Sequence, residues 1–224
     1  MTKRHVLVTG ACGALGRAVA EHLAGRGAEV IRLDIATGGA PPSLALAIEA
    51  DLNDAQSLAK ALARVRQRTD RLAGLVNVAG GFAWETLADG SLETWDRLYR
   101  LNLRSAVAMS MAALPLLRAG GGAIVNVGAA AAAKAGVGMA AYAASKAGVA
   151  RLTESLAEEM KDEGVRVNAV LPSIIDTPAN RAAMPDADFG RWVAPDALAK
   201  VIAFLLSDDA SAITGASIPV TGRV

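Results

Sequence analysis

Short apolar segments alternate with longer helical ones along the whole of this 224-residue chain. Several of the short segments are continuous apolar runs, which is typical of strands buried on both faces of a parallel sheet. Strict alternation of this kind predicts an α/β fold, a doubly wound parallel sheet of about seven strands flanked by helices. We expect strands at His5–Thr9, Glu29–Asp34, Leu46–Ala50, Leu75–Val78, Ala123–Gly128, Val165–Leu171 and Ala216–Val220, and helices at Leu15–Gly25, Ala55–Thr69, Leu92–Leu117, Met139–Glu163 and Pro195–Leu206.

The chain shows no break in composition, so residues 1–224 are expected to form a single domain. The stretch Thr37–Ser43 is expected to be a loop and no linker, because the alternation continues beyond it. Charges are scattered and the formal net charge is +1, so we expect neither a nucleic-acid nor a membrane partner. The single cysteine, Cys12, excludes a disulfide within the chain, and no Cys/His cluster has metal-ligand spacing. No apolar run is long enough to span a membrane, and a cytoplasmic location is expected.

The first expected strand leads through a glycine-rich loop, Thr9–Gly16, into a helix. In this interpretation Gly10 permits the tight turn, Gly13 lets a pyrophosphate approach the backbone, and Gly16 allows close packing of the helix. Free amides at the helix start then bind the phosphates. An ordinary strand–helix turn is the alternative, but the position of the loop at the start of the fold favours a dinucleotide site.

Asp34 ends the second strand, about 20 residues beyond the loop, where a carboxylate binds the ribose hydroxyls of NAD and repels a 2′-phosphate. We expect Arg32 to point to the opposite face of the strand. NAD(H) is therefore favoured, with NADP(H) as the alternative. Asp34 could instead begin a turn. Asp51 and Leu52 follow the third strand and are expected to contact the adenine or, equally, to cap the next helix.

Tyr142 and Lys146 lie four residues apart near the start of a long expected helix, so both side chains can reach one site. Hydride transfer to a substrate requires a proton as well. A nearby cation favours the phenolate, lowers the tyrosine pKa and makes the phenol a usable acid or base. The pair therefore predicts a proton-transfer site.

Taken together, the glycine loop, Asn77-Val78-Ala79-Gly80, Asn102, the Tyr142/Lys146 pair and Pro172–Thr177 occur in an order that resembles the short-chain dehydrogenases/reductases. The resemblance covers the whole chain and implies a Rossmann-type NAD(P)-dependent oxidoreductase acting on a small molecule. It implies catalytic roles for Tyr142, Lys146 and Asn102, with Asn102 supporting a proton-relay water. Structural hydrogen bonding is the alternative for Asn77 and Asn102. Cofactor contacts are expected from Gly10, Cys12, Gly13, Ala14, Leu15, Gly16, Asp34, Asp51, Leu52, Asn77, Ala79, Gly80, Tyr142, Lys146, Pro172, Ile175 and Thr177.

Two departures from the family pattern are visible. The glycines are evenly spaced at positions 10, 13 and 16, and alanine (Ala129) occupies the position, thirteen residues before the tyrosine, where the family usually has a catalytic serine. Gly128 has no hydroxyl, and Ser145 is a poor substitute because it is adjacent to Lys146 on the helix. Loss of an oriented donor to an oxyanion costs about 10²–10³ in rate, which argues against an ordinary ketone reductase.

One branch of the family, the quinonoid dihydropteridine reductases, resembles this sequence at these same points. It is similar in the Gly-Ala-Leu-Gly loop, in the alanine, and in the stretch from Val170 to Trp192. The resemblance implies NADH-dependent reduction of a quinonoid dihydropterin or a similar planar acceptor. Ala129, Phe82, Trp84 and Trp192 are then expected at the substrate, with plain packing as the alternative for each aromatic residue. This sequence has Asn102 at a position where the animal enzymes of this branch lack an asparagine.

Two other functions stay open: a dehydrogenase/reductase of small alcohols, ketones or other carbonyl compounds, and a dinucleotide-binding sensor with weak catalysis. The family resemblance also implies a homodimer or homotetramer formed through the helices around Met139–Gly148 and Met109–Leu117.

Overall fold

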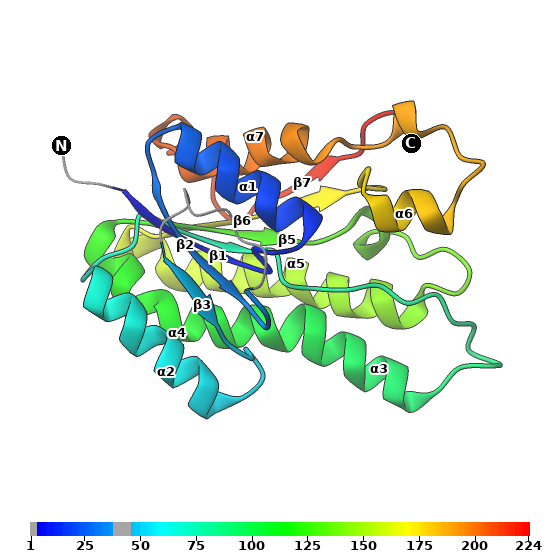
Figure 1. The fold of residues 1–224 in the computed structure, drawn as a ribbon, viewed down its shortest axis with the longest axis horizontal. Coiled ribbons are helices and arrows are strands. Elements are labelled where there is room, and N and C mark those ends of the chain that lie inside the picture. Colours follow the sequence, from blue (N-terminus) through cyan, green and yellow to red (C-terminus); the bar gives the residue numbers. More distant parts are fainter. Residues whose placement is uncertain (1–3, 38–45) are drawn as a thin grey trace.

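The seven strands form one parallel sheet, shown in Figure 1. A computed structural model describes residues 4–37 and 46–224. The strand order is β3-β2-β1-β4-β5-β6-β7, and every neighbouring pair is parallel. The order reverses direction at β1, which is the doubly wound arrangement that the alternation predicted. The strands are β1 (His5–Thr9), β2 (Glu29–Asp34), β3 (Ala47–Glu49), β4 (Gly74–Asn77), β5 (Ala123–Val127), β6 (Arg166–Pro172) and β7 (Ser217–Val220).

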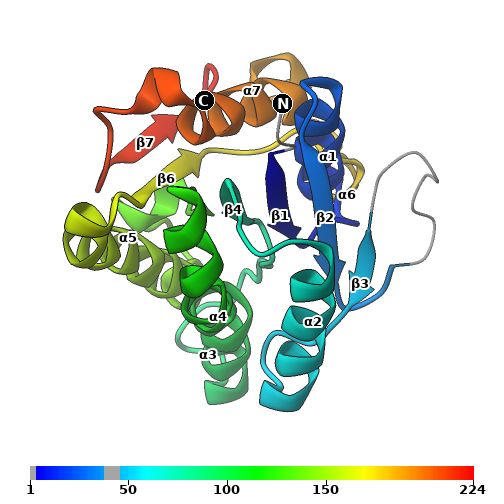
Figure 2. The ribbon, with the colours of Figure 1, turned by 90° about the vertical axis from the view of Figure 1, so that its left-hand side faces the viewer.

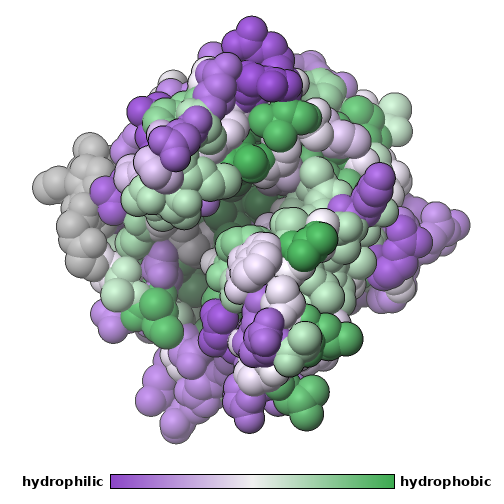
Figure 3. Space-filling model, turned by 90° about the vertical axis from the view of Figure 1, so that its right-hand side faces the viewer, coloured by the Kyte–Doolittle hydropathy of each residue, from purple (hydrophilic) through white to green (hydrophobic). Residues whose placement is uncertain are grey.

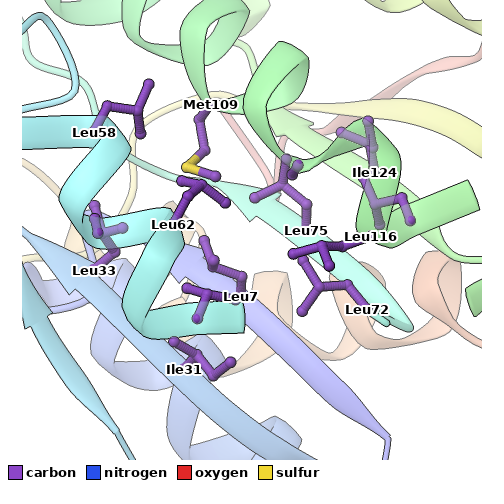
Figure 4. Packing of buried hydrophobic residues seen from close by; sticks show 14 of the residues in the cluster. Leu7, Ile31, Leu33, Leu58, Leu62, Leu72, Leu75, Met109, Leu116 and Ile124 are labelled. Carbon is purple, nitrogen blue, oxygen red and sulfur yellow. The ribbon is translucent and has the colours of Figure 1, made fainter. Parts of the chain in front are cut away.

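Helices cover both faces of the sheet (Figure 2). The helices α1 (Ala14–Gly25) and α7 (Pro195–Leu206) pack on one face, and α2 (Ala55–Arg68), α4 (Ser105–Gly120) and α5 (Ala140–Met160) pack on the other. A hydrophobic core lies on each face of the sheet, and alternate residues of each strand contribute to one core or the other. On β1, for example, Val6 and Val8 join the α1/α7 core, whereas Leu7 joins the core under α2 and α4. In Figure 4 the side chain of Leu62 from α2 lies between Met109 of α4 and Leu7 of the sheet.

The long helix expected over Leu92–Leu117 is interrupted. It consists of α3 (Leu92–Leu98), a π-helical segment (Tyr99–Arg104) and α4. The amide of Ser105 bonds to the carbonyl oxygen of Arg100, five residues back, so one extra residue is accommodated in the turn. The periodic sequence could not show this insertion, because a π-bulge shifts the apolar stripe by only one residue.

Several element ends differ from the prediction by a few residues. The third strand is shorter than expected, and the sixth begins at Arg166 and continues to Pro172. Gly120 belongs to α4, and Gly121 adopts the left-handed conformation with φ 58°. The short helix α6 (Pro178–Ala183) was not predicted, although its Thr177 N-cap and Pro178 at the first turn are ordinary start signals. Of the expected Thr37–Ser43 loop, residues 38–43 lie outside the described residues.

Across residues 4–37 and 46–224, none of the helices combines the length and the apolar character that crossing a membrane requires. The same described residues contain no group of three or more His, Cys, Asp or Glu side chains able to hold a metal ion.

Candidate active site

A cavity of about 1430 Å³ opens at the carboxyl ends of the strands, and Figure 3 shows this face hollowed at its centre. Ligand sites in proteins usually occupy about 300–1000 Å³, so the cavity has room for a large cofactor together with a small substrate. It is lined by most of the residues that the sequence singled out: Gly10, Gly13, Ala14, Leu15, Gly16, Asp34, Asp51, Leu52, Ala79, Gly80, Phe82, Trp84, Ala129, Tyr142, Lys146, Pro172, Ile175 and Thr177.

The glycine loop places the start of α1 directly under one end of the cavity. Gly10 has φ 60°, and a Cβ there would lie 2.7 Å from the amide nitrogen of Ala79. A Cβ on Gly16 would collide with the carbonyl oxygen of Gly10, so close packing of the helix needs glycine. At Gly13 a Cβ would meet only the Gly10 oxygen, at 3.5 Å. Gly13 therefore faces open space, as a loop that admits a pyrophosphate requires.

Asp34 lies at the end of β2, where its carboxylate accepts two backbone hydrogen bonds. Oδ2 accepts from the amide of Cys12 at 2.8 Å, and Oδ1 accepts from the amide of Ile35 at 2.7 Å. These bonds fix the carboxylate at the cavity wall, where it remains able to accept from ribose hydroxyls. Cys12 does not line the cavity, so its expected contact with the cofactor is replaced by this support of Asp34.

Arg32 lies on the same face of β2 as Asp34, and the expectation of opposite faces was wrong. Side chains alternate with a period of two, so positions 32 and 34 share a face. The Arg32 side chain is 3% exposed, and both Arg32 and Asp34 act on the Cys12 thiol. Burial and the Asp34 carboxylate raise the pKa of that thiol, whereas Arg32 and Arg17 oppose the change.

Tyr142 and Lys146 project from the first two turns of α5 into the cavity. The Lys146 ammonium is buried and donates to the carbonyl oxygen of Val127 at 2.8 Å. Burial lowers the pKa of Lys146 from 10.5 to about 8 and raises the pKa of Tyr142 from 10.0 to about 12. The sequence argument expected the cation to lower the tyrosine pKa. The structure shows the opposite direction, because desolvation penalises the charged form of each group.

Asn102 lies in the π-helical segment, and its side chain makes three hydrogen bonds. Oδ1 accepts from the Gly81 amide at 2.8 Å, and Nδ2 donates to the Gly81 carbonyl at 3.0 Å and to Ser145 Oγ at 2.9 Å. Ser145 in turn donates to the Tyr142 carbonyl at 2.7 Å, so its hydroxyl proton is not directed at the cavity. A Cβ on Gly80 would lie 2.7 Å from Asn102 Oδ1 and 3.3 Å from Lys146 Nζ. Asn102 thus fixes the chain beside Lys146 without lining the cavity itself.

Asn77 belongs to a buried polar network and does not line the cavity. Its Nδ2 donates to Asn126 Oδ1 at 2.9 Å and to Ser110 Oγ at 3.1 Å, and Asn126 donates to Thr153 Oγ1 at 2.9 Å. The structural alternative for Asn77 is therefore the correct one. The sequence reasoning also missed Thr9, whose hydroxyl accepts from the amides of Val78 and Ala79 and joins the glycine loop to the chain after β4.

The part of the cavity around Tyr142 is apolar and aromatic. Ala129 is buried in the cavity wall, which Tyr142 also lines. The Phe82 ring meets the Tyr142 ring edge-on, with centroids 5.0 Å apart and an interplanar angle of 81°. Trp84 covers Gly138 so closely that a Cβ there would collide with the indole. Lys134 also lines the cavity. Among the described residues, Lys134 and Lys146 are the charged side chains in this part of it.

Trp192 does not contribute to the cavity, which corrects the expectation that it contacts the substrate. Its side chain is 8% exposed, and its ring packs against Phe189 with centroids 4.8 Å apart. The packing alternative applies because the chain folds back after α6 and turns this residue toward the core. Sequence position alone could not distinguish the two faces of an irregular segment.

Comparison with known proteins gives matches over nearly the whole chain. Residues 10–222 match the family described as enoyl-(acyl carrier protein) reductase. Meso-2,3-butanediol dehydrogenase of Serratia marcescens is 32% identical, with 97% of this chain and 92% of that protein covered. The chain belongs to the short-chain dehydrogenase/reductase family.

Two further relatives of this dehydrogenase/reductase span similar lengths. The (3R)-3-hydroxyacyl-CoA dehydrogenase of Mus musculus is 33% identical, with 96% of this chain and 94% of that protein covered. The structure of a 3-ketoacyl-(acyl-carrier-protein) reductase from Brucella melitensis in complex with NADH has a TM-score of 0.88 and 29% identity, with 98% of each chain covered. The chain is therefore an oxidoreductase of this family, whose members use NAD(P)(H), and the sheet matches the family fold. The resemblance to dihydropteridine reductases in particular receives no support from these comparisons.

Proposed function

We propose that this protein is an NADH-dependent reductase of a planar conjugated acceptor, of which a quinonoid dihydropterin is the leading candidate. The observation that carries the proposal is Ala129. A buried methyl group lies in the cavity wall where the family pattern places a hydroxyl donor. A substrate carbonyl would have no oriented donor from this position, whereas reduction of a quinonoid ring creates no oxyanion that requires one.

The cavity fits a dinucleotide at its other end. Gly13 leaves open space above the start of α1, the first-turn amides are available to phosphates, and the Asp34 carboxylate is positioned for ribose hydroxyls. When bound, a nicotinamide supplies or accepts the hydride. NADH is preferred in this proposal because the Asp34 carboxylate repels a 2′-phosphate. Arg32 on the same face weakens that argument, so NADPH is the alternative to be measured.

In this proposal Tyr142 donates the proton that accompanies reduction. With a pKa of about 12 the buried phenol holds its proton at neutral pH, as an acid must before transfer. The Lys146 ammonium, held by the Val127 carbonyl, faces the same space and stabilises the phenolate left after transfer. Asn102 positions Gly81 and Ser145 around this pair, and we retain the relay water as its second role.

Phe82 and Trp84 supply the flat surface that a heterocycle needs. Both side chains line the cavity and are more than half exposed, 55% and 60% respectively. Exposed aromatic rings beside an apolar wall favour a planar ligand, which can stack on one ring and meet the edge of another.

The second candidate is a dehydrogenase/reductase of small alcohols or carbonyl compounds. The butanediol dehydrogenase and hydroxyacyl-CoA dehydrogenase relatives favour it, since both act on hydroxyl-bearing substrates by their names. A dinucleotide-binding sensor is a third class. The buried Lys146 ammonium, bonded to the Val127 carbonyl, argues against it because burying a lysine costs stability without benefit to a pure binder.

The test is NADH oxidation with chemically generated quinonoid 6,7-dimethyldihydropterin, run beside NADPH and a panel of ketones, diketones and acyl thioesters. We expect rapid turnover of the pterin with NADH and weak turnover of the carbonyl compounds. Tyr142→Phe should abolish turnover while dinucleotide binding persists. Turnover of a carbonyl compound but not of the pterin would favour the second candidate, and full turnover in Tyr142→Phe would remove the assigned acid.

We also propose a homodimer or homotetramer assembled through α4 and α5, as the family resemblance implies. Met111 on α4 is a large apolar side chain that is 68% exposed, which is typical of a face covered by another subunit. Light scattering at low micromolar concentration should show the assembly, and a strictly monomeric protein would contradict it.

A further inference from the structure

The chain between β6 and α7, residues 173–193, forms a strap along the nicotinamide end of the cavity. Several of its residues line the cavity, among them Ile175, Thr177 and Asn180. The base of the strap is closed by backbone hydrogen bonds, from the Asp176 amide to the Val193 carbonyl at 2.8 Å and from the Val193 amide to the Ile174 carbonyl at 2.9 Å. These bonds fix the two ends of the strap, and side-chain contacts add to the backbone bonds of α6 in its middle.

Four side chains of the strap form a continuous column outside the cavity. The Arg181 guanidinium makes two parallel bonds to the Asp176 carboxylate, at 2.6 and 2.7 Å. Its Cζ lies 4.8 Å from the centre of the Phe189 ring, and that ring packs on the buried Trp192. Arg181 thus connects the carboxylate next to Thr177 with an aromatic pair anchored in the core.

The other side of the strap is fastened by the last residues of the chain. Arg191 donates from Nε and Nη2 to the carbonyl oxygen of Arg223, and Arg223 donates from Nη2 to the carbonyl oxygen of Gly190. Figure 1 shows this segment beside the strap. The Phe189–Trp192 turn is therefore a fixed support, and Arg181 connects α6 to it through the Phe189 ring.

We propose that Arg181 is a positioning residue that holds Thr177 and Ile175 against the nicotinamide end of the cavity and thereby sets dinucleotide affinity, not the rate of the chemical step. This inference rests on the proposed function and on the cofactor contacts that the family resemblance implies for Ile175 and Thr177; the nicotinamide end is the part of the cavity that these two residues line. Asp176 is joined to Ile175 and Thr177 by single peptide bonds, so the Arg181 bonds to its carboxylate restrain both neighbours. This restraint is in addition to the Asp176 amide bond to Val193 and the Asn180 side-chain bond to the Ile175 carbonyl. When the strap is already ordered in the free protein, binding does not have to order it. The observed dissociation constant equals the intrinsic one divided by the fraction of molecules in the binding-competent state, so a larger ordered fraction lowers it.

A purely structural role predicts a different result. Arg181 and Asp176 form an ion pair that is partly exposed, with side chains 52% and 22% exposed. An isolated exposed pair contributes little to stability, and its loss would alter neither ligand affinity nor catalysis. Arg71 provides a matched control, because it forms a similar exposed pair with Asp70 outside the cavity lining.

The experiment compares Arg181→Met, Arg181→Lys, Phe189→Leu and Arg71→Met with the unaltered protein. Dissociation constants for NADH and NADPH are measured by fluorescence titration without substrate, together with the unfolding midpoint and the rate of proteolysis within residues 184–190. Steady-state kinetics with an active acceptor separate kcat from the KM for the dinucleotide.

We expect Arg181→Met to raise the dissociation constant of the preferred dinucleotide about five- to tenfold. We expect kcat at saturation to be unchanged within about twofold. Phe189→Leu should act in the same direction, Arg181→Lys should fall between the two, and Arg71→Met should bind as the unaltered protein does. Cleavage of the strap should be faster in Arg181→Met and slowed by the dinucleotide.

Unchanged affinity and unchanged cleavage in Arg181→Met would overturn the inference, as would a fall in kcat with unchanged affinity. Failure of the proposed function gives a separate signature. If the unaltered protein bound neither dinucleotide, the cofactor assignment would fall and the cleavage rates alone would decide whether Arg181 orders the strap.

Discussion

The Lys146 ammonium lies 2.8 Å from the Val127 carbonyl oxygen, and the residue is only 5% exposed. One hydrogen bond to a strand end therefore holds a buried cation one helical turn from Tyr142. The arrangement costs stability, because burial of a charge is compensated here by a single carbonyl dipole. It also makes the charge of Lys146 sensitive to pH, since burial lowers its pKa to about 8.

Lys146→Met should therefore stabilise the protein at neutral pH while it abolishes turnover. The folded-state pKa of Lys146 is about 8 against an ordinary 10.5, so the lysine destabilises the fold below pH 8. That penalty is relieved as pH rises from about 8 to 10.5, because the folded protein then releases the proton first. We expect Lys146→Met to gain about 1–2 kcal/mol at pH 7 and less at pH 9.5, measured by urea unfolding. An equal difference at both pH values would contradict the assigned pKa.

Ala129→Ser should restore a donor beside Tyr142. We expect ketone turnover to rise about tenfold or more, toward the 10²–10³ that an oriented donor provides, while turnover of a quinonoid acceptor stays level or falls. Ala130→Ser is the matched control, because Ala130 also lines the cavity one residue further along the chain. The measurement is kcat/KM for both substrate types in each variant. A ketone rate that responds equally to the two serines would contradict a special role for position 129.

Gly138→Ala should destabilise the protein for two separable reasons. Gly138 has φ 71°, which costs a non-glycine residue about 1–2 kcal/mol, and the new Cβ would collide with the Trp84 indole. Replacing Trp84 by alanine removes the collision but leaves the backbone strain. We therefore expect the double variant to lose less stability than the sum of the single variants, by about 1 kcal/mol. Additive losses in urea unfolding would show that the two residues do not interact.

Asp34→Ser should shift the choice of dinucleotide. The substitution removes the acceptor for the ribose hydroxyls and the repulsion of a 2′-phosphate, so NADH should bind about tenfold more weakly and NADPH more tightly. Adding Arg32→Met to Asp34→Ser tests whether the buried arginine on the same face assists NADPH. Titration of both dinucleotides with each variant is the measurement, and an unchanged NADH/NADPH ratio in Asp34→Ser would remove Asp34 from the specificity site.

Much of the fold was predictable because it depends on local patterns. The apolar runs of β1 and β5 and the glycine loop are each decided by residues that are close in sequence, and the structure confirms the seven-stranded parallel sheet they predicted. The interruption at Tyr99–Arg104 was not predictable in this way. It arises where Asn102 turns inward to bond Gly81 and Ser145, residues that are distant in sequence.

The same distinction between local and long-range features applies to the candidate site. The sequence indicated Tyr142, Lys146, Asp34 and the glycine loop, since each follows a strand at the edge where ligands bind. It did not distinguish Phe82, which faces the cavity, from Trp192, which packs in the core, because both are aromatic residues in irregular chain. It also misjudged the pKa of Tyr142, since desolvation depends on how completely distant segments cover the phenol.

The amino-acid sequence by itself therefore determined the parallel α/β architecture, the family, and the placement of Tyr142 and Lys146 on one helix face, because hydrophobic periodicity, glycine conformation and residue spacing act over short range. Only the tertiary structure decided which polar groups serve the cavity and which support it. The Asn102 bonds to Gly81 and the cover of Trp84 over Gly138 join residues that are distant in sequence. Such contacts are set by the packing of whole elements, and no local pattern encodes the distance at which two segments meet.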